Sequence, residues 1–279
     1  MSDTRAGDDG VTHEFGVGPA YPTAHTQFTN DTTPVTGGRR PHPDTGSPTG
    51  AHATSPAGPT FGSDATAPVP TFAPSPESLV TEGVRDVGMA FVGASLVAGY
   101  GDPKGLGWVG RVVARTQHPD LDLTAYNLGV RGDTSGDVVA RWGAECHPRW
   151  KGRAERRLVL SVGAGDITSG MTMARSRLNL ANVVDEATNA GIGVFVVGLA
   201  PTLDPEQNRR VEALAEAQAD VCARRGVTYV DCYRPLVGHD QWMADLAASP
   251  DRVHPGQAGY GLIAWLVLHN GWNDWLQLG

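Results

Sequence analysis

Five short apolar runs, separated by longer segments of helical periodicity, constrain the fold of this chain more than any other sequence feature. The runs are rich in the β-branched and aromatic residues typical of strands. Their alternation with helical segments is typical of parallel strands joined by crossover helices, so the sequence predicts an α/β fold with a parallel five-stranded sheet. The expected strands are residues 87–92, 123–128, 158–162, 194–199 and 227–233.

Three of the intervening segments carry helix signals. Residues 205–225 follow a capping residue, Asp204, have proline at the first helical position, and stop at Gly226. Residues 171–190 and 256–269 place aliphatic side chains on one face. We expect these helices to pack against the sheet.

The N-terminal part of the chain differs in composition from the rest. Residues 1–80 contain no Trp, Cys, Ile or Lys, hold one leucine, Leu79, and include 12 of the chain's 20 prolines. Such a segment cannot bury enough apolar surface to offset the entropy lost on ordering. The sequence therefore predicts a disordered Pro/Thr/Gly-rich tail over residues 1–84, interpreted as a spacer, and one folded domain over residues 85–279.

Charge and cysteine usage narrow the class of protein. The net charge is −8 and the basic residues are scattered, so we expect no nucleic-acid partner. Cys146, Cys222 and Cys232 form no CxxC pair and are odd in number, which favours reduced thiols over a disulfide framework or a zinc site. The start shows no secretory signal, and no run of 18 apolar residues follows. We expect a cytoplasmic protein without integral membrane association.

Polar residues follow several of the expected strands. Parallel sheets gather reactive groups at the carboxyl ends of their strands, so these segments are the candidate site. They are residues 93–96 (Gly-Ala-Ser-Leu), 127–134 (Asn-Leu-Gly-Val-Arg-Gly-Asp-Thr), 163–166 (Gly-Ala-Gly-Asp) and, near the C-terminus, 251–255 (Asp-Arg-Val-His-Pro).

These residue types suit acyl transfer. A serine directly after a strand, Ser95, can present its hydroxyl and its own N–H to a carbonyl group. Two residues separate Asp251 from His254, so one turn can hold both, with the carboxylate orienting the imidazole that takes the proton of Ser95. Taken singly, each motif has a plainer interpretation, because serines after strands are common and the Asp-His pair also flanks a helix start.

Together, in this order, the four segments resemble the conserved blocks of the SGNH/GDSL hydrolase family, and the resemblance covers residues 87–275. It implies a three-layer α/β/α sandwich of the SGNH/flavodoxin-like kind. It also implies Ser95 as nucleophile, His254 as general base and acid, and Asp251 as the orienting carboxylate. The oxyanion hole is implied at Ser95, Gly132 and Gly165, with the first two contributing backbone N–H groups.

The resemblance leaves the substrate open. Family members act on short-chain esters, thioesters, lipids and acetylated sugars, so a small acyl-ester substrate is implied without a choice among these. No cofactor or metal is implied. The acyl acceptor, water or another alcohol, and the oligomeric state are not determined by the sequence.

Two positions depart from the family pattern. Ala94 replaces the aspartate of Gly-Asp-Ser-Leu, and Gly165 replaces the asparagine of Gly-x-Asn-Asp, whose side chain donates to the oxyanion. Losing one such donor costs about 10²- to 10³-fold in rate. The chain is therefore interpreted as a serine esterase with an incomplete oxyanion hole, the alternative being a weakened or inactive binding module. If the missing donor limits turnover, Gly165→Asn is expected to raise kcat.

Three further patterns are interpreted as follows. Residues 105–110 match G-x-G-x-x-G but do not follow a strand, so we expect a loop leading into a helix rather than a dinucleotide site. Val97 breaks the G-x-S-x-G elbow around Ser95, which argues against the α/β-hydrolase fold. Tyr100, Trp108 and Trp142 are candidates to line a pocket, although we expect at least two of them in the core.

Overall fold

A computed structural model describes residues 83–278, so the tail predicted over residues 1–84 lies outside the described residues except for its last two positions. The described part forms one parallel sheet in the order β2-β1-β3-β4-β5, as the alternating sequence pattern predicts. Its strands are β1 (Arg85–Gly93), β2 (Leu121–Gly129), β3 (Glu155–Ser161), β4 (Gly193–Val197) and β5 (Thr228–Val230).

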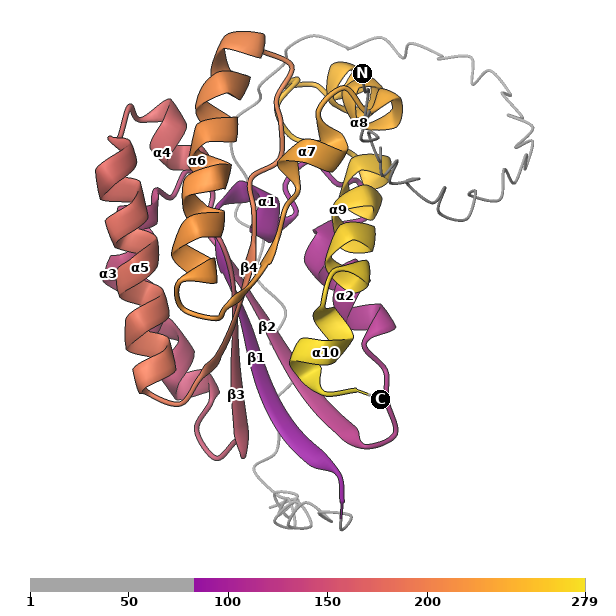
Figure 1. Cartoon of the computed structure of the whole chain (residues 1–279). Coiled ribbons are helices and arrows are strands. Elements are labelled where there is room, and N and C mark those ends of the chain that lie inside the picture. The colour runs from indigo at the N-terminus through magenta and orange to yellow at the C-terminus, as the bar shows by residue number, and fades with distance from the viewer. Residues whose placement is uncertain (1–82, 279) are drawn as a thin grey trace, which may run out of the picture. The chain divides into compact units, whose positions relative to one another are not determined.

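Helices cover both faces of the sheet (Figure 1). One layer contains α3 (Ser135–Arg149), α5 (Met173–Asn189) and α6 (Pro205–Ala223), and the other contains α2 (Gly107–Arg115), α9 (Gln257–His269) and α10 (Trp272–Leu276). This arrangement confirms the three-layer α/β/α sandwich. The remaining helices are α1 (Ser95–Ala98), α4 (Ala164–Thr168), α7 (Tyr233–Leu236) and α8 (Asp240–Ala248).

The core consists mainly of two clusters, one on each face of the sheet. Along β1, Met89 and Phe91 belong to the cluster shared with α2 and α9, whereas Ala90 and Val92 belong to the cluster shared with α3 and α5. Successive strand residues point to opposite faces, so a strand covered on both faces must be apolar at every position. This explains why the central strands β1 and β4 are continuous apolar runs, whereas the edge strand β2 alternates with polar residues and is only partly buried.

The strand bounds differ from the predicted ones by one to three residues, and the two largest differences are at the start of β3 and the end of β5. β3 begins at Glu155, three residues before the expected start, because the charged side chain of Glu155 pairs with Arg85 at 2.6 Å instead of facing the core. β5 ends at Val230, before the expected end at residue 233, because the Asp231 carboxylate accepts the N–H of Tyr233 at 2.9 Å at the start of α7. In both cases side-chain hydrogen bonds override the apolar pattern.

The cysteines are free and buried. Burial raises the pKa of the Cys146 and Cys222 thiols to about 12, and it also raises the pKa of Cys232. The expectation of reduced thiols agrees with this packing. Among residues 83–278, no helix combines the length and apolarity needed to cross a membrane.

Candidate active site

The candidate site lies where the strand order reverses. β1 and β3 are neighbours in the sheet although β2 lies between them in the sequence, and ligands of open parallel sheets bind beside the carboxyl ends of strands at such a point. Ser95 follows β1, Gly165 follows β3, and His254 lies between α8 and α9. They line one hollow of about 540 Å³, together with Ala94, Arg131, Gly132, Asp133, Ala164, Thr168 and Val253.

The loop that carries Ser95 is anchored from neighbouring segments. The Asn127 side chain on β2 donates to the carbonyl of Val97 at 2.7 Å. Arg141 on α3 donates to the carbonyl of Gly93 at 3.1 Å. These two bonds hold the loop although Ala94 has no side-chain hydrogen-bonding group. The roles of Asn127 and Arg141 depend on contacts across the fold and had no signal in the local sequence.

Asp251 and His254 form a compact unit within one turn, as their spacing predicts. Asp251 Oδ2 lies 2.7 Å from His254 Nδ1, and Oδ1 accepts the N–H groups of Val253 and His254, each at 3.0 Å. Burial alone would raise the pKa of Asp251, but these hydrogen bonds outweigh it and lower that pKa. The carboxylate therefore stays ionised and engages Nδ1, which leaves Nε2 of His254 available for proton transfer.

Ser95 and His254 line the same hollow, but no hydrogen bond joins their side chains in the described part of the chain. In apo sites such bonds are often long and tighten when substrate is bound. Tyr100 lies beside this pair, with its ring edge-on to His254 at a centroid distance of 4.9 Å. The Tyr260 hydroxyl on α9 donates to the Tyr100 carbonyl at 2.6 Å, which fixes this loop beside the histidine turn.

The three aromatic candidates separate as expected. Trp108 and Trp142 are each 1% exposed and belong to the two core clusters. Tyr100 is 39% exposed and contacts His254. The prediction that at least two of these side chains are core residues is confirmed.

The space beside Gly165 is filled. A Cβ atom at this position would overlap the carbonyl oxygen of Asp133 and stand 2.9 Å from its carbonyl carbon and 3.2 Å from the Cα of Thr134. The Asp133 side chain is held by Arg141 at 2.6 Å, so the segment is anchored in this position. An asparagine side chain at position 165 therefore requires this backbone to shift, and the expectation that Gly165→Asn raises kcat stays a prediction.

Asp166, the residue after Gly165, joins two of the site's segments. Its side chain is 1% exposed, and Oδ1 accepts the N–H of Ser135 at the start of α3 at 2.6 Å. This bond holds α4, which carries Gly165, against the end of the segment that carries Gly132. The relative position of the two glycines is thus determined by a buried carboxylate.

The G-x-G-x-x-G pattern at residues 105–110 is a turn followed by the start of α2, as expected. The buried carboxylate of Asp102 accepts the N–H of Gly107 at 2.9 Å and pairs with Arg111. A Cβ atom on Gly107 would lie 2.6 Å from the Cα of Gly99, so close contact between two backbone segments requires glycine here. Packing against Gly99 thus accounts for the glycine at position 107.

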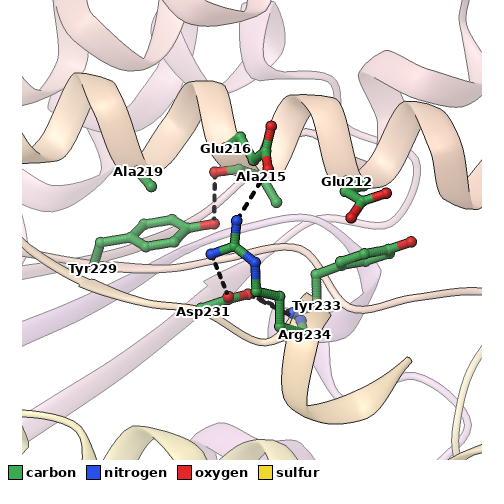
Figure 2. Close-up of a pocket in the computed structure, with 8 residues that line it drawn as sticks. All are labelled: Glu212, Ala215, Glu216, Ala219, Tyr229, Asp231, Tyr233 and Arg234. Atoms are coloured by element: carbon green, nitrogen blue, oxygen red, sulfur yellow. Dashed lines mark hydrogen bonds and ion pairs between the residues drawn. The ribbon is translucent and has the colours of Figure 1, made fainter. Parts of the chain in front are cut away.

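A second hollow, of about 400 Å³, lies between α6 and the β5–α7 segment (Figure 2). Arg234 pairs there with Glu216 at 3.0 Å and with Asp231 at 3.5 Å. The Tyr229 hydroxyl donates to the carbonyl of Ala215 at 3.1 Å, and burial raises its pKa. These polar groups satisfy one another, so the hollow at the strand ends is the better candidate for chemistry.

The sheet order, the helices on both faces and the hollow at the carboxyl ends of the strands place the chain in the class of three-layer α/β folds with a site at the strand ends, a fold it shares with SGNH-type esterases. The chain belongs to the GDSL-like lipase/acylhydrolase family, whose model matches residues 91–262.

Individual relatives agree with this assignment. The chain is 28% identical over 185 residues to the esterase TesA of Pseudomonas aeruginosa, which covers 64% of this chain and 85% of the relative. Its fold is similar to that of Axe2, an acetylxylan esterase from Geobacillus stearothermophilus, with a TM-score of 0.56 and 20% identity over 69% of this chain and 97% of that one. The psychrotrophic esterase EstA from Pseudoalteromonas sp. gives a TM-score of 0.51 at 18% identity over 68% of this chain and 98% of that one.

Proposed function

We propose that this protein hydrolyses carboxylic esters of small acyl groups, with Ser95 as nucleophile, His254 as general base and acid, and Asp251 as the orienting carboxylate. The observation that carries the proposal is the 2.7 Å contact between His254 Nδ1 and Asp251 Oδ2 in the hollow that Ser95 lines. Family membership supports an acyl hydrolase.

The mechanism follows the roles of these groups. Ser95 Oγ attacks the ester carbonyl carbon while His254 Nε2 takes its proton, and Asp251 stabilises the resulting imidazolium. The tetrahedral intermediate expels the alcohol, which receives that proton from His254, and an acyl-enzyme remains. A water molecule then attacks the acyl carbon with His254 again as base, and the acid leaves as Ser95 Oγ recovers its proton.

The oxyanion in this scheme is stabilised mainly by backbone donors. We assign the N–H groups of Ser95 and Gly132 to this role, with Gly165 contributing no side chain. The Asp133 carbonyl fills the space beside Gly165, where the side chain of the missing donor would lie. The loss of this donor favours slow turnover, and a non-catalytic role is therefore the second candidate function. In that alternative the chain is a weakened or inactive SGNH-fold protein that binds acyl compounds or serves as a scaffold.

The compartment remains a prediction. The buried, free thiols of Cys146, Cys222 and Cys232 support a reducing cytoplasmic environment. The absence of a nucleic-acid partner, expected from the charge distribution, is likewise a prediction.

The test compares Ser95→Ala with Ser169→Ala, a serine outside the lining of the hollow. We expect a fluorophosphonate probe to label the native protein and the Ser169→Ala protein but not Ser95→Ala. Hydrolysis of 4-nitrophenyl acetate should follow the same pattern. Unlabelled native protein, or turnover that survives in Ser95→Ala, would contradict the enzyme and favour the binding module.

A further inference from the structure

We propose that Arg131 makes the site selective for esters whose leaving alcohol carries a negative charge, such as a carboxylate or a phosphate group. This inference rests on the proposed function, because it assigns substrate parts to places around Ser95 and His254. It concerns one side chain in the hollow that the acyl-transfer mechanism does not use.

The guanidinium of Arg131 lies over the face of the Tyr100 ring. Its central carbon lies 3.3 Å from the centroid of the Tyr100 ring, and the side chain lines the hollow. Stacking of this kind orients a planar guanidinium while leaving the N–H groups at its edge able to donate. A carboxylate or phosphate accepts two such parallel hydrogen bonds, so the group suits an anion better than a neutral acceptor.

Arg131 is also the charged group of the hollow that lacks a counterion. Asp133 is paired with Arg141 at 2.6 Å, and His254 contacts Asp251 at 2.7 Å. Among the ion pairs formed by residues 83–278, none includes Arg131. The net charge of the chain is −8, which repels anions at long range, so attraction of an anion at this site requires a local cation.

The position of Tyr100 indicates which part of the substrate Arg131 meets. The Tyr100 ring has Arg131 over its face and His254 at 4.9 Å, edge-on, so the three side chains form a continuous row. His254 delivers a proton to the departing alcohol, and that alcohol must therefore lie on the histidine side of the reacting carbon. Arg131 accordingly faces the alcohol rather than the acyl chain.

The experiment uses acetate esters that differ in the charge of the leaving phenol. They are 4-acetoxybenzoate, which carries a carboxylate, its neutral methyl ester, and 4-acetoxyphenyl phosphate. A fourth ester, the hemisuccinate of methyl 4-hydroxybenzoate, carries its charge on the acyl side. The readout is the ratio of kcat/KM for each charged ester to that for the neutral one, because general effects of a substitution on the site cancel in this ratio.

We expect Arg131→Gln to lower the ratio for the phenol-side anions about tenfold, which corresponds to the loss of one charge-assisted contact. The change should lie in KM, since the anion is remote from the reacting atoms. Arg131→Lys should keep part of the ratio, because it retains charge without the planar fork. Arg115→Gln removes the same formal charge at the far end of α2 and should keep the native ratio. Comparing kcat/KM for 4-acetoxybenzoate with that for 4-acetoxyphenyl phosphate shows whether the site prefers a carboxylate or a phosphate.

Three outcomes would overturn the proposal. The ratio could stay unchanged in Arg131→Gln, the acyl-side hemisuccinate could be the ester affected, or kcat could fall equally for all esters, as expected of an oxyanion donor.

If no ester is turned over, binding of 4-hydroxybenzoate and its methyl ester is measured instead. The proposed role of Arg131 is refuted if 4-hydroxybenzoate and its methyl ester bind with equal affinity, or if Arg131→Gln leaves the preference for the anion unchanged. Absence of turnover that depends on Ser95 refutes the proposed esterase function alone.

Discussion

Replacing Gly165 by alanine should destabilise the protein, even though Gly165 lies in helix α4, where alanine is normally the better residue. The added methyl group would overlap the Asp133 carbonyl oxygen and stand 2.9 Å from its carbon. The neighbouring atoms are backbone, and the segment is held by the Asp133–Arg141 ion pair at 2.6 Å. Relief therefore requires a shift of the backbone that also carries Gly132.

The magnitude follows from two opposing contributions. Forcing a methyl group into a filled space costs typically about 1–3 kcal/mol. Replacing glycine by alanine in a helix returns about 0.5–1 kcal/mol. We expect the free energy of unfolding to fall by about 1–2 kcal/mol, with a parallel loss of esterase activity because the Gly132 N–H moves.

Gly261 on α9 provides the matched control. Apart from the backbone of its own helix and its chain neighbours, no heavy atom lies within 4 Å of the position that its Cβ would take, so Gly261→Ala should stabilise the protein by about 0.5–1 kcal/mol. Urea unfolding of both variants, followed by tryptophan fluorescence, measures the difference. With slopes of about 1–3 kcal/mol per molar urea, the two midpoints should differ by roughly 1 M.

The outcome that refutes this reasoning is a Gly165→Ala protein with native stability and native turnover. That result would mean that the segment at residues 132–134 yields without cost and that the space beside Gly165 is adaptable. The Gly165→Asn protein should then also fold normally, and an increase in its kcat would show that the missing donor limits catalysis after all.

Two further predictions concern the rest of the fold. Glu155→Gln should lower the free energy of unfolding at pH 7 by roughly 1–2 kcal/mol, after allowance for partial exposure of the ion pair. Arg85 holds the pKa of Glu155 down at about 2, below the ordinary 4.5, so the stabilisation is complete above about pH 4.5 and is lost as the pH falls toward 2. Urea midpoints of both proteins should thus converge in acid, and a constant gap would contradict the ion pair. The thiols of Cys146, Cys222 and Cys232 should not react with a thiol reagent at pH 8 in the native protein but should all react in denaturant, whereas rapid labelling of native protein would mean that the core opens.

Much of the fold was predictable from local patterns. Apolar runs located the five strands of the described residues, most clearly β1 and β4, because strands covered on both faces are apolar nearly throughout. The start of α6 followed from Asp204 and Pro205, and the Asp204 side chain accepts the N–H of Glu206 as a capping residue should. The early start of β3 was missed because the pairing of Glu155 with Arg85, 70 residues away, leaves no local signal.

By itself, the sequence determined the family, the class of fold and the residues proposed for chemistry. These are carried by neighbours in the chain, as in the turn that joins Asp251 to His254. The tertiary structure alone decided that the Asp133 carbonyl fills the space beside Gly165 and that Arg131 stacks on Tyr100. Such contacts depend on the order of strands in the sheet and on packing between loops, and residues distant in sequence carry no periodic signal for either.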